Sequence, residues 1–245
     1  MAISGPKKTN RIKDAKALIE TVLRLEPQTA AFDCDGTLWS GDAGEGFLKW
    51  ELDRKLVSDD VVRRMRARYA QYEAGKVPEA EMCGEMVTMH AGLFNSDVAR
   101  AAEQFFINDI DTGIFPEMRE LLANLRFRRC DVWLVSSSAD WLIQAGARRF
   151  GVAPDHVLAT TVAVEKGKAT DKLIRVPNAA GKSDALKEHL KGPVDVAFGN
   201  SKWDVEMLAS ARQAFVINPT AELVQLADQR SWPVYLPKSN APRKR

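Results

Sequence analysis

Apolar and polar residues follow one another along this chain in two distinct patterns. Short apolar runs that end in polar residues or glycine predict buried strands, and they lie around residues 30–32, 132–135, 194–198 and 214–217. Between most of them, apolar residues recur at steps of three or four, which predicts amphipathic helices. Buried strands alternating with helices predict an α/β fold, a parallel sheet with helices on both faces.

Three stretches depart from this alternation. Residues 11–25 predict an amphipathic helix that ends before Pro27. Residues 42–112 show helical spacing without a strand pattern, and such a block is too long for a simple crossover, so we interpret it as an inserted all-α domain. Residues 156–176 predict a strand and hairpin that turns at Gly167.

These patterns divide the chain into four parts. The expected boundaries are a helical extension over 1–28, a discontinuous core over 29–41 and 113–237, a helical domain over 42–112, and a basic tail over 238–245.

Composition limits the classes of function. The 245 residues are 45% hydrophobic and 28% charged, with a formal net charge of +2, which is typical of a globular domain. The basic residues form no aromatic-interleaved stripe, so we do not expect a nucleic acid as partner. No long apolar segment is present, so we expect no membrane association. Three widely spaced cysteines suggest neither a zinc site nor a disulfide framework, which fits the cytoplasm.

Two carboxylates follow the first predicted strand. Asp33 and Asp35 are separated by one residue, so alternation along a strand points them the same way, and Gly36 lets the backbone turn. Buried carboxylates are costly unless they are paired or bind a metal. The pattern favours a shared ion or substrate over an ordinary acidic turn.

Three later strand ends also carry polar residues. Ser136 follows the strand at 132–135 and suits either an anionic oxygen or helix capping. Lys182 lies in the turn that opens a helix expected over 183–191, where it suits either a phosphate, as a point charge, or simple solvation. Three nearby lysines compete with it for the first role: Lys166, Lys168 and Lys172. Asn200 and Asp204 follow the strand at 194–198; taken alone, Asp204 is explained as an acidic residue near a helix start.

Together these clusters resemble the four motifs of the haloacid dehalogenase-like (HAD) phosphohydrolase superfamily. Residues 33–37, Asp-Cys-Asp-Gly-Thr, resemble the first motif, and Gly-Lys182 before a small residue is similar to the third. Residues 135–142 resemble the second motif of phosphoserine phosphatase relatives. Residues 199–208 resemble the fourth, except that Asn200 replaces its first aspartate. The resemblance implies a Rossmann-like core with a helical cap.

The resemblance also implies a mechanism. In the family the first aspartate attacks phosphorus, so Asp33 would become an aspartyl-phosphate, and Asp35 would act as general acid and base. Ser136 and Lys182 would bind the phosphoryl oxygens. The residues expected to hold Mg²⁺ are Asp33, Asp35 through its main-chain carbonyl, Asn200 and, in support, Asp204.

The expected partner is a small phosphorylated metabolite. In phosphoserine phosphatases an acidic residue after the first motif contacts the substrate's amino group, and Asp42 matches it, with Glu45 nearby. Met86 falls where their cap presents an arginine to the substrate carboxylate, so an amino-bearing ester without a carboxylate suits this chain as well as phosphoserine. Trp39 and Trp141 are aromatic candidates for that pocket or for packing.

The residues leave two other functions open. The same groups would permit phosphotransfer to an acceptor other than water. Alternatively, the chain is a binding protein for phosphate compounds, with catalysis impaired because Asn200 brings no negative charge to the metal. The presence of Asp33, Asp35, Ser136 and Lys182 together favours the enzyme, and the oligomeric state is left open.

Overall fold

A seven-stranded sheet forms the centre of the computed structural model, which describes residues 10–238. The sheet order is β4-β3-β2-β1-β5-β6-β7, and the pairs are parallel except for the antiparallel β3–β4 hairpin. The strands are β1 (Thr29–Phe32), β2 (Asp131–Ala139), β3 (Val157–Glu165), β4 (Lys168–Arg175), β5 (Val196–Gly199), β6 (Gln213–Ile217) and β7 (Val234–Tyr235).

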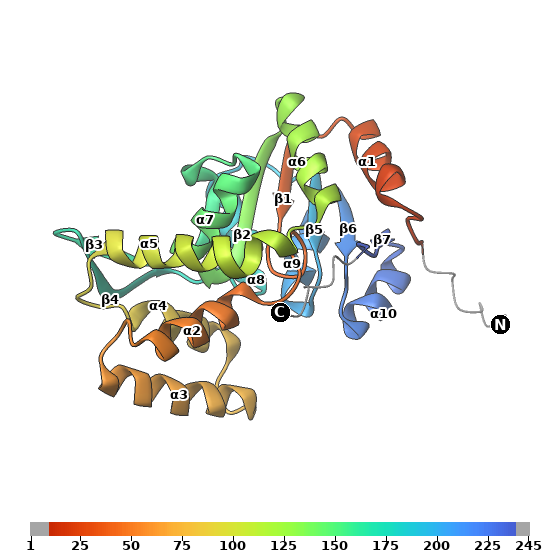
Figure 1. Cartoon of the computed structure of the whole chain (residues 1–245). Helices are drawn as coiled ribbons and strands as arrows, with labels where there is room; N and C mark the ends of the chain where they lie inside the picture. The colour runs from red at the N-terminus through yellow and green to blue at the C-terminus, as the bar shows by residue number, and fades with distance from the viewer. Residues whose placement is uncertain (1–9, 239–245) are drawn as a thin grey trace.

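Helices cover both faces of the sheet because alternate strand residues point to opposite sides. Ala30 and Phe32 pack with residues of α1, α6 and α7, whereas Ala31 packs with α8, α9 and α10 (Figure 1). The helices of the core are α1 (Ala15–Arg24), α6 (Pro116–Phe127), α7 (Asp140–Phe150), α8 (Ala180–Lys187), α9 (Val205–Ser210) and α10 (Ala221–Arg230). This arrangement confirms the predicted α/β class.

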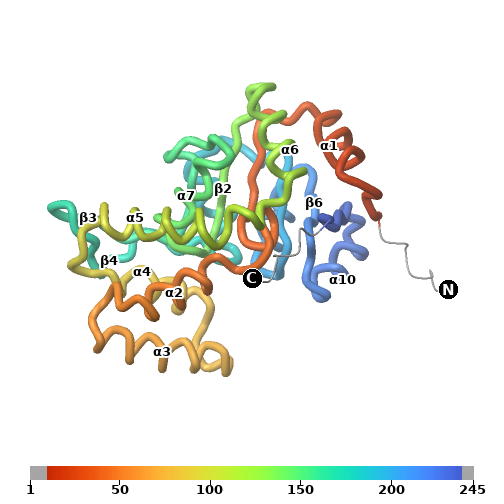
Figure 2. The backbone as a smooth tube through the Cα atoms, in the orientation of Figure 1, coloured from red at the N-terminus to blue at the C-terminus, as the bar shows by residue number. Residues whose placement is uncertain are grey.

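The segment between β1 and α6 is helical, as its spacing predicts. Four helices, which we call the cap helices, occupy it: α2 (Ala43–Arg54), α3 (Asp59–Glu73), α4 (Glu79–Thr88) and α5 (Asn95–Phe105), followed by a π-helical turn, Phe106–Ile110. Figure 2 shows α2, α3 and α4 below the sheet, whereas α5 runs toward α7. Helices α2 to α4 bury a small cluster that includes Leu48, Met65 and Met82. The domain boundaries given above stay a prediction.

The β3–β4 hairpin reaches the cap helices. The loop between α4 and α5 hydrogen-bonds to β4 and its turn: Gly92 N donates to the Ala169 carbonyl at 2.8 Å, and Ala169 N donates to the Leu93 carbonyl at 2.9 Å. Asn95 N donates to the Gly167 carbonyl at 2.9 Å. The hairpin predicted around Gly167 is present, and it joins the core sheet to the cap helices.

Two boundaries differ from the sequence patterns. Strand β2 continues through the serines to Ala139, because its far end pairs with Thr160 of β3 after an irregularity in the register. Helix α8 begins at Ala180, so Lys182 lies in its first turn. Helix α1 ends at Arg24, before Pro27, as predicted. The basic tail lies outside the described residues, apart from its first residue.

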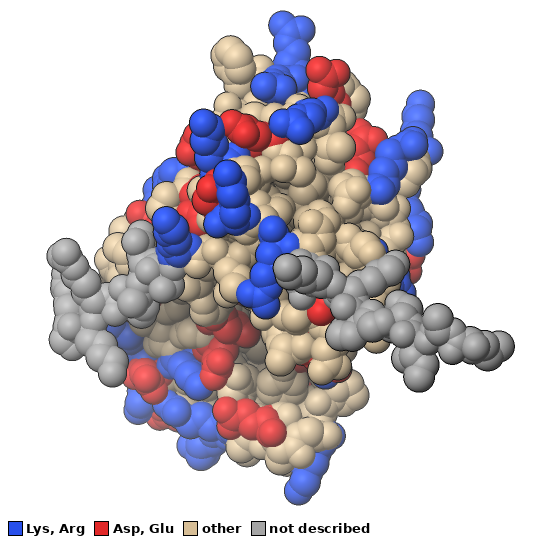
Figure 3. Space-filling view, turned by 90° about the vertical axis from the view of Figure 1, so that its right-hand side faces the viewer, with Lys and Arg blue, Asp and Glu red and all other residues tan. Residues whose placement is uncertain are grey.

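The surface carries charges of both signs. On the face shown in Figure 3, Lys and Arg side chains are interspersed with Asp and Glu side chains rather than gathered in one field. Within residues 10–238, no helix combines the length and the apolar character that crossing a membrane requires.

Candidate active site

A cavity of about 510 Å³ lies where the strands β1, β2 and β5 end and the cap helices approach. Carboxyl ends of parallel strands meet at one edge of a sheet, and ligands bind there. Seven of the eight residues predicted for the site line the cavity: Asp33, Asp35, Asp42, Glu45, Ser136, Lys182 and Asn200. Asp204 does not line it but is buried behind it, in contact with Lys182 and Ser201. The structure thus brings the four motifs together.

Asp33 directly follows β1. Its main-chain N–H donates to the Phe198 carbonyl at 2.9 Å, which extends the pairing of β1 with β5 and fixes the position of the side chain. One carboxylate oxygen, Oδ2, accepts from the Thr37 hydroxyl at 2.7 Å, and Oδ1 accepts from Lys182 Nζ at 2.7 Å. Burial and the Asp204 charge raise the pKa of Asp33 to about 6, although Lys182 and Thr37 oppose the rise.

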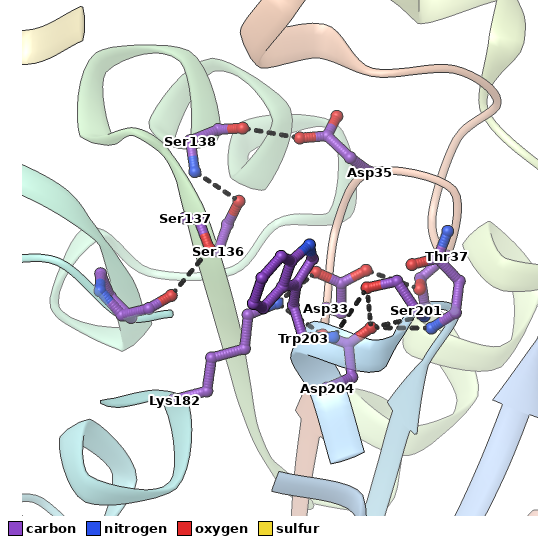
Figure 4. Close-up of polar contacts among 12 residues, drawn as sticks. Asp33, Asp35, Thr37, Ser136, Ser137, Ser138, Lys182, Ser201, Trp203 and Asp204 are labelled. Atoms are coloured by element: carbon purple, nitrogen blue, oxygen red, sulfur yellow. Dashed lines mark hydrogen bonds and ion pairs between the residues drawn. The ribbon is translucent and has the colours of Figure 1, made fainter. Parts of the chain in front are cut away.

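Lys182 joins two buried carboxylates (Figure 4). Its Nζ lies 2.7 Å from Asp33 Oδ1 and 2.6 Å from Asp204 Oδ1. Burial lowers the pKa of Lys182, but the two carboxylates raise it by more, so the ammonium stays charged. The competing lysines of the hairpin do not line the cavity; Lys182 is the lysine that does.

Asp204 holds the loop that follows β5. Its Oδ2 accepts from the main-chain N–H groups of Asn200 and Ser201, both at 2.9 Å, and from the Ser201 hydroxyl at 3.2 Å. Asp204 Oδ1 accepts from Lys182 Nζ, so both carboxylate oxygens of Asp204 have hydrogen-bond donors within the protein. Asp204 therefore fixes the Asn200 loop and the Lys182 ammonium in one contact network.

Asp35 lies on the cap side of Asp33. Its Oδ1 accepts from Trp39 Nε1 and from the Ala43 N–H at the start of α2, both at 2.7 Å, and its Oδ2 accepts from the Ser138 hydroxyl at 2.7 Å. Burial raises the pKa of Asp35 to about 7 against these hydrogen bonds. Both aspartates line the cavity, but their hydrogen-bond partners differ.

The serines after Val135 serve different purposes. Ser136 is buried at the cavity, and its hydroxyl accepts from Ser138 N–H at 3.1 Å. The Ser137 hydroxyl donates to the Pro177 carbonyl at 2.9 Å and accepts from Asn178 Nδ2 at 3.3 Å, which ties β2 to the loop before Lys182. Only Ser136 was predicted as a phosphate ligand, and the other two position their neighbours.

Asn200 packs against Gly36. The backbone of Gly36 has φ +75°, and a Cβ at that position would lie 1.9 Å from Asn200 Nδ2. The Gly36 carbonyl accepts from Asn218 Nδ2 at 3.2 Å, and the Asn200 carbonyl accepts from Thr220 N–H at 2.9 Å. The glycine therefore leaves the space that the Asn200 amide occupies at the cavity.

These oxygens fit a magnesium ion. Mg²⁺ takes oxygen ligands and is usually held by one or two carboxylates together with substrate phosphate and water. Asp33 supplies a carboxylate and Asn200 an amide oxygen at the same cavity. Within the described part of the chain, no group of three or more His, Cys, Asp or Glu side chains is placed to hold a metal. Asp33 and Asn200 are therefore the residues whose oxygens suit Mg²⁺, and the ion itself stays a prediction.

Asp42 and Glu45 lie at the start of α2. Asp42 caps this helix by accepting from Glu45 N–H at 2.8 Å, and Glu45 pairs with Lys49 one turn further on. Both line the cavity on its cap side. Their positions are compatible with the substrate role predicted for them, which stays a prediction.

The tryptophans considered for the pocket pack elsewhere. Trp39 is fully buried and packs edge-on against Phe106, and Trp141 Nε1 donates to Asn95 Oδ1 at 2.7 Å. Neither lines the cavity. The aromatic lining comes instead from Tyr69, Tyr72 and Trp203, which the sequence patterns did not indicate.

Comparison with known proteins places the chain in a family. The haloacid dehalogenase-like hydrolase family matches residues 30–209, so the chain belongs to it. A probable phosphatase of Mycobacterium tuberculosis is 28% identical over 218 residues, which cover 84% of this chain and 75% of the relative. A histidinol-phosphatase of Neisseria meningitidis is 23% identical and covers 84% of this chain and 96% of the relative.

A solved structure has the same fold. A substrate-bound phosphoserine phosphatase superposes with a TM-score of 0.56 at 18% identity, covering 87% of this chain and 94% of that one. The predicted family, its phosphoserine phosphatase-like form and the enzyme class, a phosphoric monoester hydrolase, are confirmed.

Proposed function

We propose that this HAD-type phosphoric monoester hydrolase cleaves a small amino-bearing phosphomonoester through an aspartyl-phosphate on Asp33. The observation that carries the proposal is the position of the Asp33 carboxylate. It lies buried on the floor of the cavity and is held by Thr37 on one oxygen and Lys182 on the other. A fixed carboxylate at a strand end is suited to attack a phosphorus atom in line.

Asp35 is the proposed proton carrier. In the first step an Asp33 oxygen forms a bond to phosphorus, the bond from phosphorus to the ester oxygen breaks, and Asp35 gives its proton to the departing alkoxide. In the second step Asp35 takes a proton from the water that attacks the aspartyl-phosphate, which releases phosphate and restores Asp33. Its place beside Asp33 in one cavity supports this role.

Lys182 and Ser136 are the proposed ligands of the phosphoryl oxygens. Lys182 lies within a hydrogen bond of Asp33, so its ammonium faces the group that Asp33 attacks. Ser136 lines the same cavity and is buried. When bound by Asp33, Asn200 and the Asp35 main-chain carbonyl, with Asp204 in support, Mg²⁺ offsets the repulsion between a carboxylate and a phosphate dianion.

The substrate class rests on the cap side of the cavity and on relatives. Asp42 and Glu45 place carboxylates where an ammonium group would be stabilised. One relative is named a phosphoserine phosphatase and another a histidinol-phosphatase. Both names denote phosphate esters of amino alcohols, with a carboxylate in the first and without one in the second. We propose an ester of this kind for this chain.

Phosphate release tests the proposal. The substrate is para-nitrophenyl phosphate, measured with and without Mg²⁺ in the parent, in Asp33→Asn and in Asp131→Asn. The last variant makes the same chemical change at the start of β2, the opposite end of the strand from the site. We expect metal-dependent turnover in the parent and in Asp131→Asn and none in Asp33→Asn. Turnover that persists in Asp33→Asn would refute the aspartyl-phosphate.

A second variant tests the metal ligand. Asn200→Asp adds a negative charge to the cavity that Asp33 also lines, so we expect Mg²⁺ to bind more tightly, with half-maximal activity at a lower metal concentration. A parent without turnover that gains it in Asn200→Asp would show that the parent is impaired in catalysis. A metal requirement that does not change would exclude Asn200 from the metal site.

A further inference from the structure

The cavity has two chemically different halves. One half is formed by the ends of the core strands and carries Asp33, Ser136 and Lys182. The other half faces it from α3 and α4, and we call it the cap wall: Tyr69, Tyr72, Glu79, Met82, Cys83 and Met86. Since the phosphate is held at the core half, the cap wall faces the alcohol part of the ester.

The charged side chains that line the cavity on its cap side are all acidic; Lys49, which pairs with Glu45 and lies 5.6 Å from the Tyr69 ring centroid, does not line it. Glu79 belongs to the cap wall, and Asp42 and Glu45 line the cavity next to it. None of the described lining residues from the cap helices is a lysine or an arginine, and the ammonium that lines the cavity, Lys182, is engaged by two carboxylates on the core side. A second negative charge on the alcohol part would therefore be repelled.

Glu79 is the carboxylate of the cap wall that lacks a cation. It lies in the first turn of α4, where the positive end of the helix stabilises an anion. The Tyr72 hydroxyl donates to its Oε2, and the Cys83 thiol lies 3.9 Å from its Oε1. No ion pair joins Glu79 to any Lys, Arg or His between residues 10 and 238, whereas Glu45 pairs with Lys49. Glu79 is therefore available to a cation from outside the protein.

Neutral faces that suit a cation surround this carboxylate. The rings of Tyr69 and Tyr72 lie 5.5 Å apart and are tilted by 47°. Burial and nearby carboxylates raise the pKa of both phenols, so they stay uncharged. Aromatic faces attract a positively charged nitrogen, and the thioethers of Met82 and Met86 adapt to its substituents.

We infer that the cap wall selects an alcohol that carries a positively charged nitrogen and no carboxylate, with Glu79 as the determinant of this choice. The inference rests on the proposed phosphatase function and narrows its substrate class. The phosphate bound at the core half would face the Lys182 ammonium, and the cation bound at the cap wall would face the Glu79 carboxylate. An α-carboxylate would face Glu79, Asp42 and Glu45 with no basic partner among the described lining residues.

Two substrates that differ in one group test the inference. O-phosphoethanolamine and O-phosphoserine share the phosphate and the ammonium, but only the second has a carboxylate. We expect kcat/KM to favour phosphoethanolamine at least about tenfold, which corresponds to about 1.4 kcal/mol. Para-nitrophenyl phosphate, which carries no ammonium, measures the phosphatase chemistry separately.

Three variants locate the preference. Glu79→Gln should lower the ratio of the two kcat/KM values about tenfold, and Met86→Lys should move the ratio toward phosphoserine. Glu81→Gln is the matched control: it makes the same change in α4, but Glu81 pairs with Arg68 and does not line the cavity, so the ratio should not change.

The outcomes separate the two proposals. Failure of the parent to release phosphate from para-nitrophenyl phosphate would overturn the proposed function itself. Turnover of that ester together with equal or better kcat/KM on phosphoserine would overturn the inference alone. A ratio that is the same in Glu79→Gln as in Glu81→Gln would remove Glu79 as its determinant.

Discussion

Replacing Gly36 by alanine is expected to displace Asn200. Gly36 has φ +75°, and an added Cβ would lie 1.9 Å from Asn200 Nδ2 and 2.9 Å from its Cγ. Real Cβ atoms do not approach other heavy atoms so closely, so the amide has to leave its place over Gly36. Its backbone is held at Thr220, which leaves rotation of the side chain as the available response.

The expected fall in the free energy of unfolding of Gly36→Ala has two parts. A non-glycine residue in the left-handed conformation costs about 1–2 kcal/mol, and overlap in a packed site costs about 1–3 kcal/mol more. Gly75→Ala separates them, because Gly75 has φ +70° and nothing within 4 Å of an added Cβ. We expect the free energy of unfolding to fall in Gly75→Ala by the conformational cost alone, and in Gly36→Ala by the conformational cost and the overlap cost together.

The assay combines stability with metal dependence. Unfolding in urea gives the free energy of unfolding of the parent and the two variants. Activity against Mg²⁺ concentration shows whether Asn200 has moved, and disturbing a group that supports a metal costs about 10- to 100-fold in affinity. If Gly36→Ala matched Gly75→Ala in stability and kept the parent's Mg²⁺ dependence, the position of Asn200 over Gly36 would be refuted.

Two further variants probe buried charges. Lys182→Met leaves the carboxylates of Asp33 and Asp204 buried and facing each other, so unfolding in urea should show a loss of about 3–5 kcal/mol. Burial lowers the pKa of His90, but the Glu51 carboxylate 2.6 Å away raises it by more, to above 6.5. The contribution of His90 to the free energy of unfolding is therefore fully present below pH 6.5 and is lost as the pH rises through the pKa of His90 in the folded protein. Burial raises the pKa of Glu51, so this carboxyl also makes the protein less stable as the pH rises. Thermal unfolding from pH 6 to 9 should show a falling midpoint that is flatter in His90→Gln; equal slopes would contradict the pairing.

Strand ends were the most predictable part of the site. An apolar run that stops at a carboxylate, a serine or an asparagine marks the end of a buried strand, and parallel strands bring such ends together. For this reason the sequence alone predicts Asp33, Ser136 and Asn200 at one edge of the sheet. The same pattern placed the β3–β4 hairpin with its turn at Gly167.

The cap wall was not predictable from the sequence. Helical spacing shows which side of α3 or α4 is buried, but it does not distinguish a side that packs against another helix from one that faces a cavity. Tyr69, Tyr72 and Glu79 face the cavity because of how two helices sit over the sheet. Trp39 shows the reverse case: it follows the proposed catalytic residues Asp33 and Asp35 in the sequence, but it packs in the core and donates a hydrogen bond to Asp35 instead of lining the cavity.

The β3–β4 hairpin has a consequence for how substrate enters. The cap helices are attached to the core by the chain before α2 and the chain after α5, and the hydrogen bonds of Gly92, Ala169 and Asn95 add a third attachment. Helix α5 is also held to α7, by the Asn95–Trp141 hydrogen bond and by ion pairs of Glu103 with Arg148 and Arg149. Attachments at several separate places do not allow the cap helices to rotate about a single hinge. Widening the entrance then requires either that the hairpin travels with the cap helices or that its three hydrogen bonds break. Hydrogen exchange at the Ala169 amide would report directly on which of these motions admits the substrate.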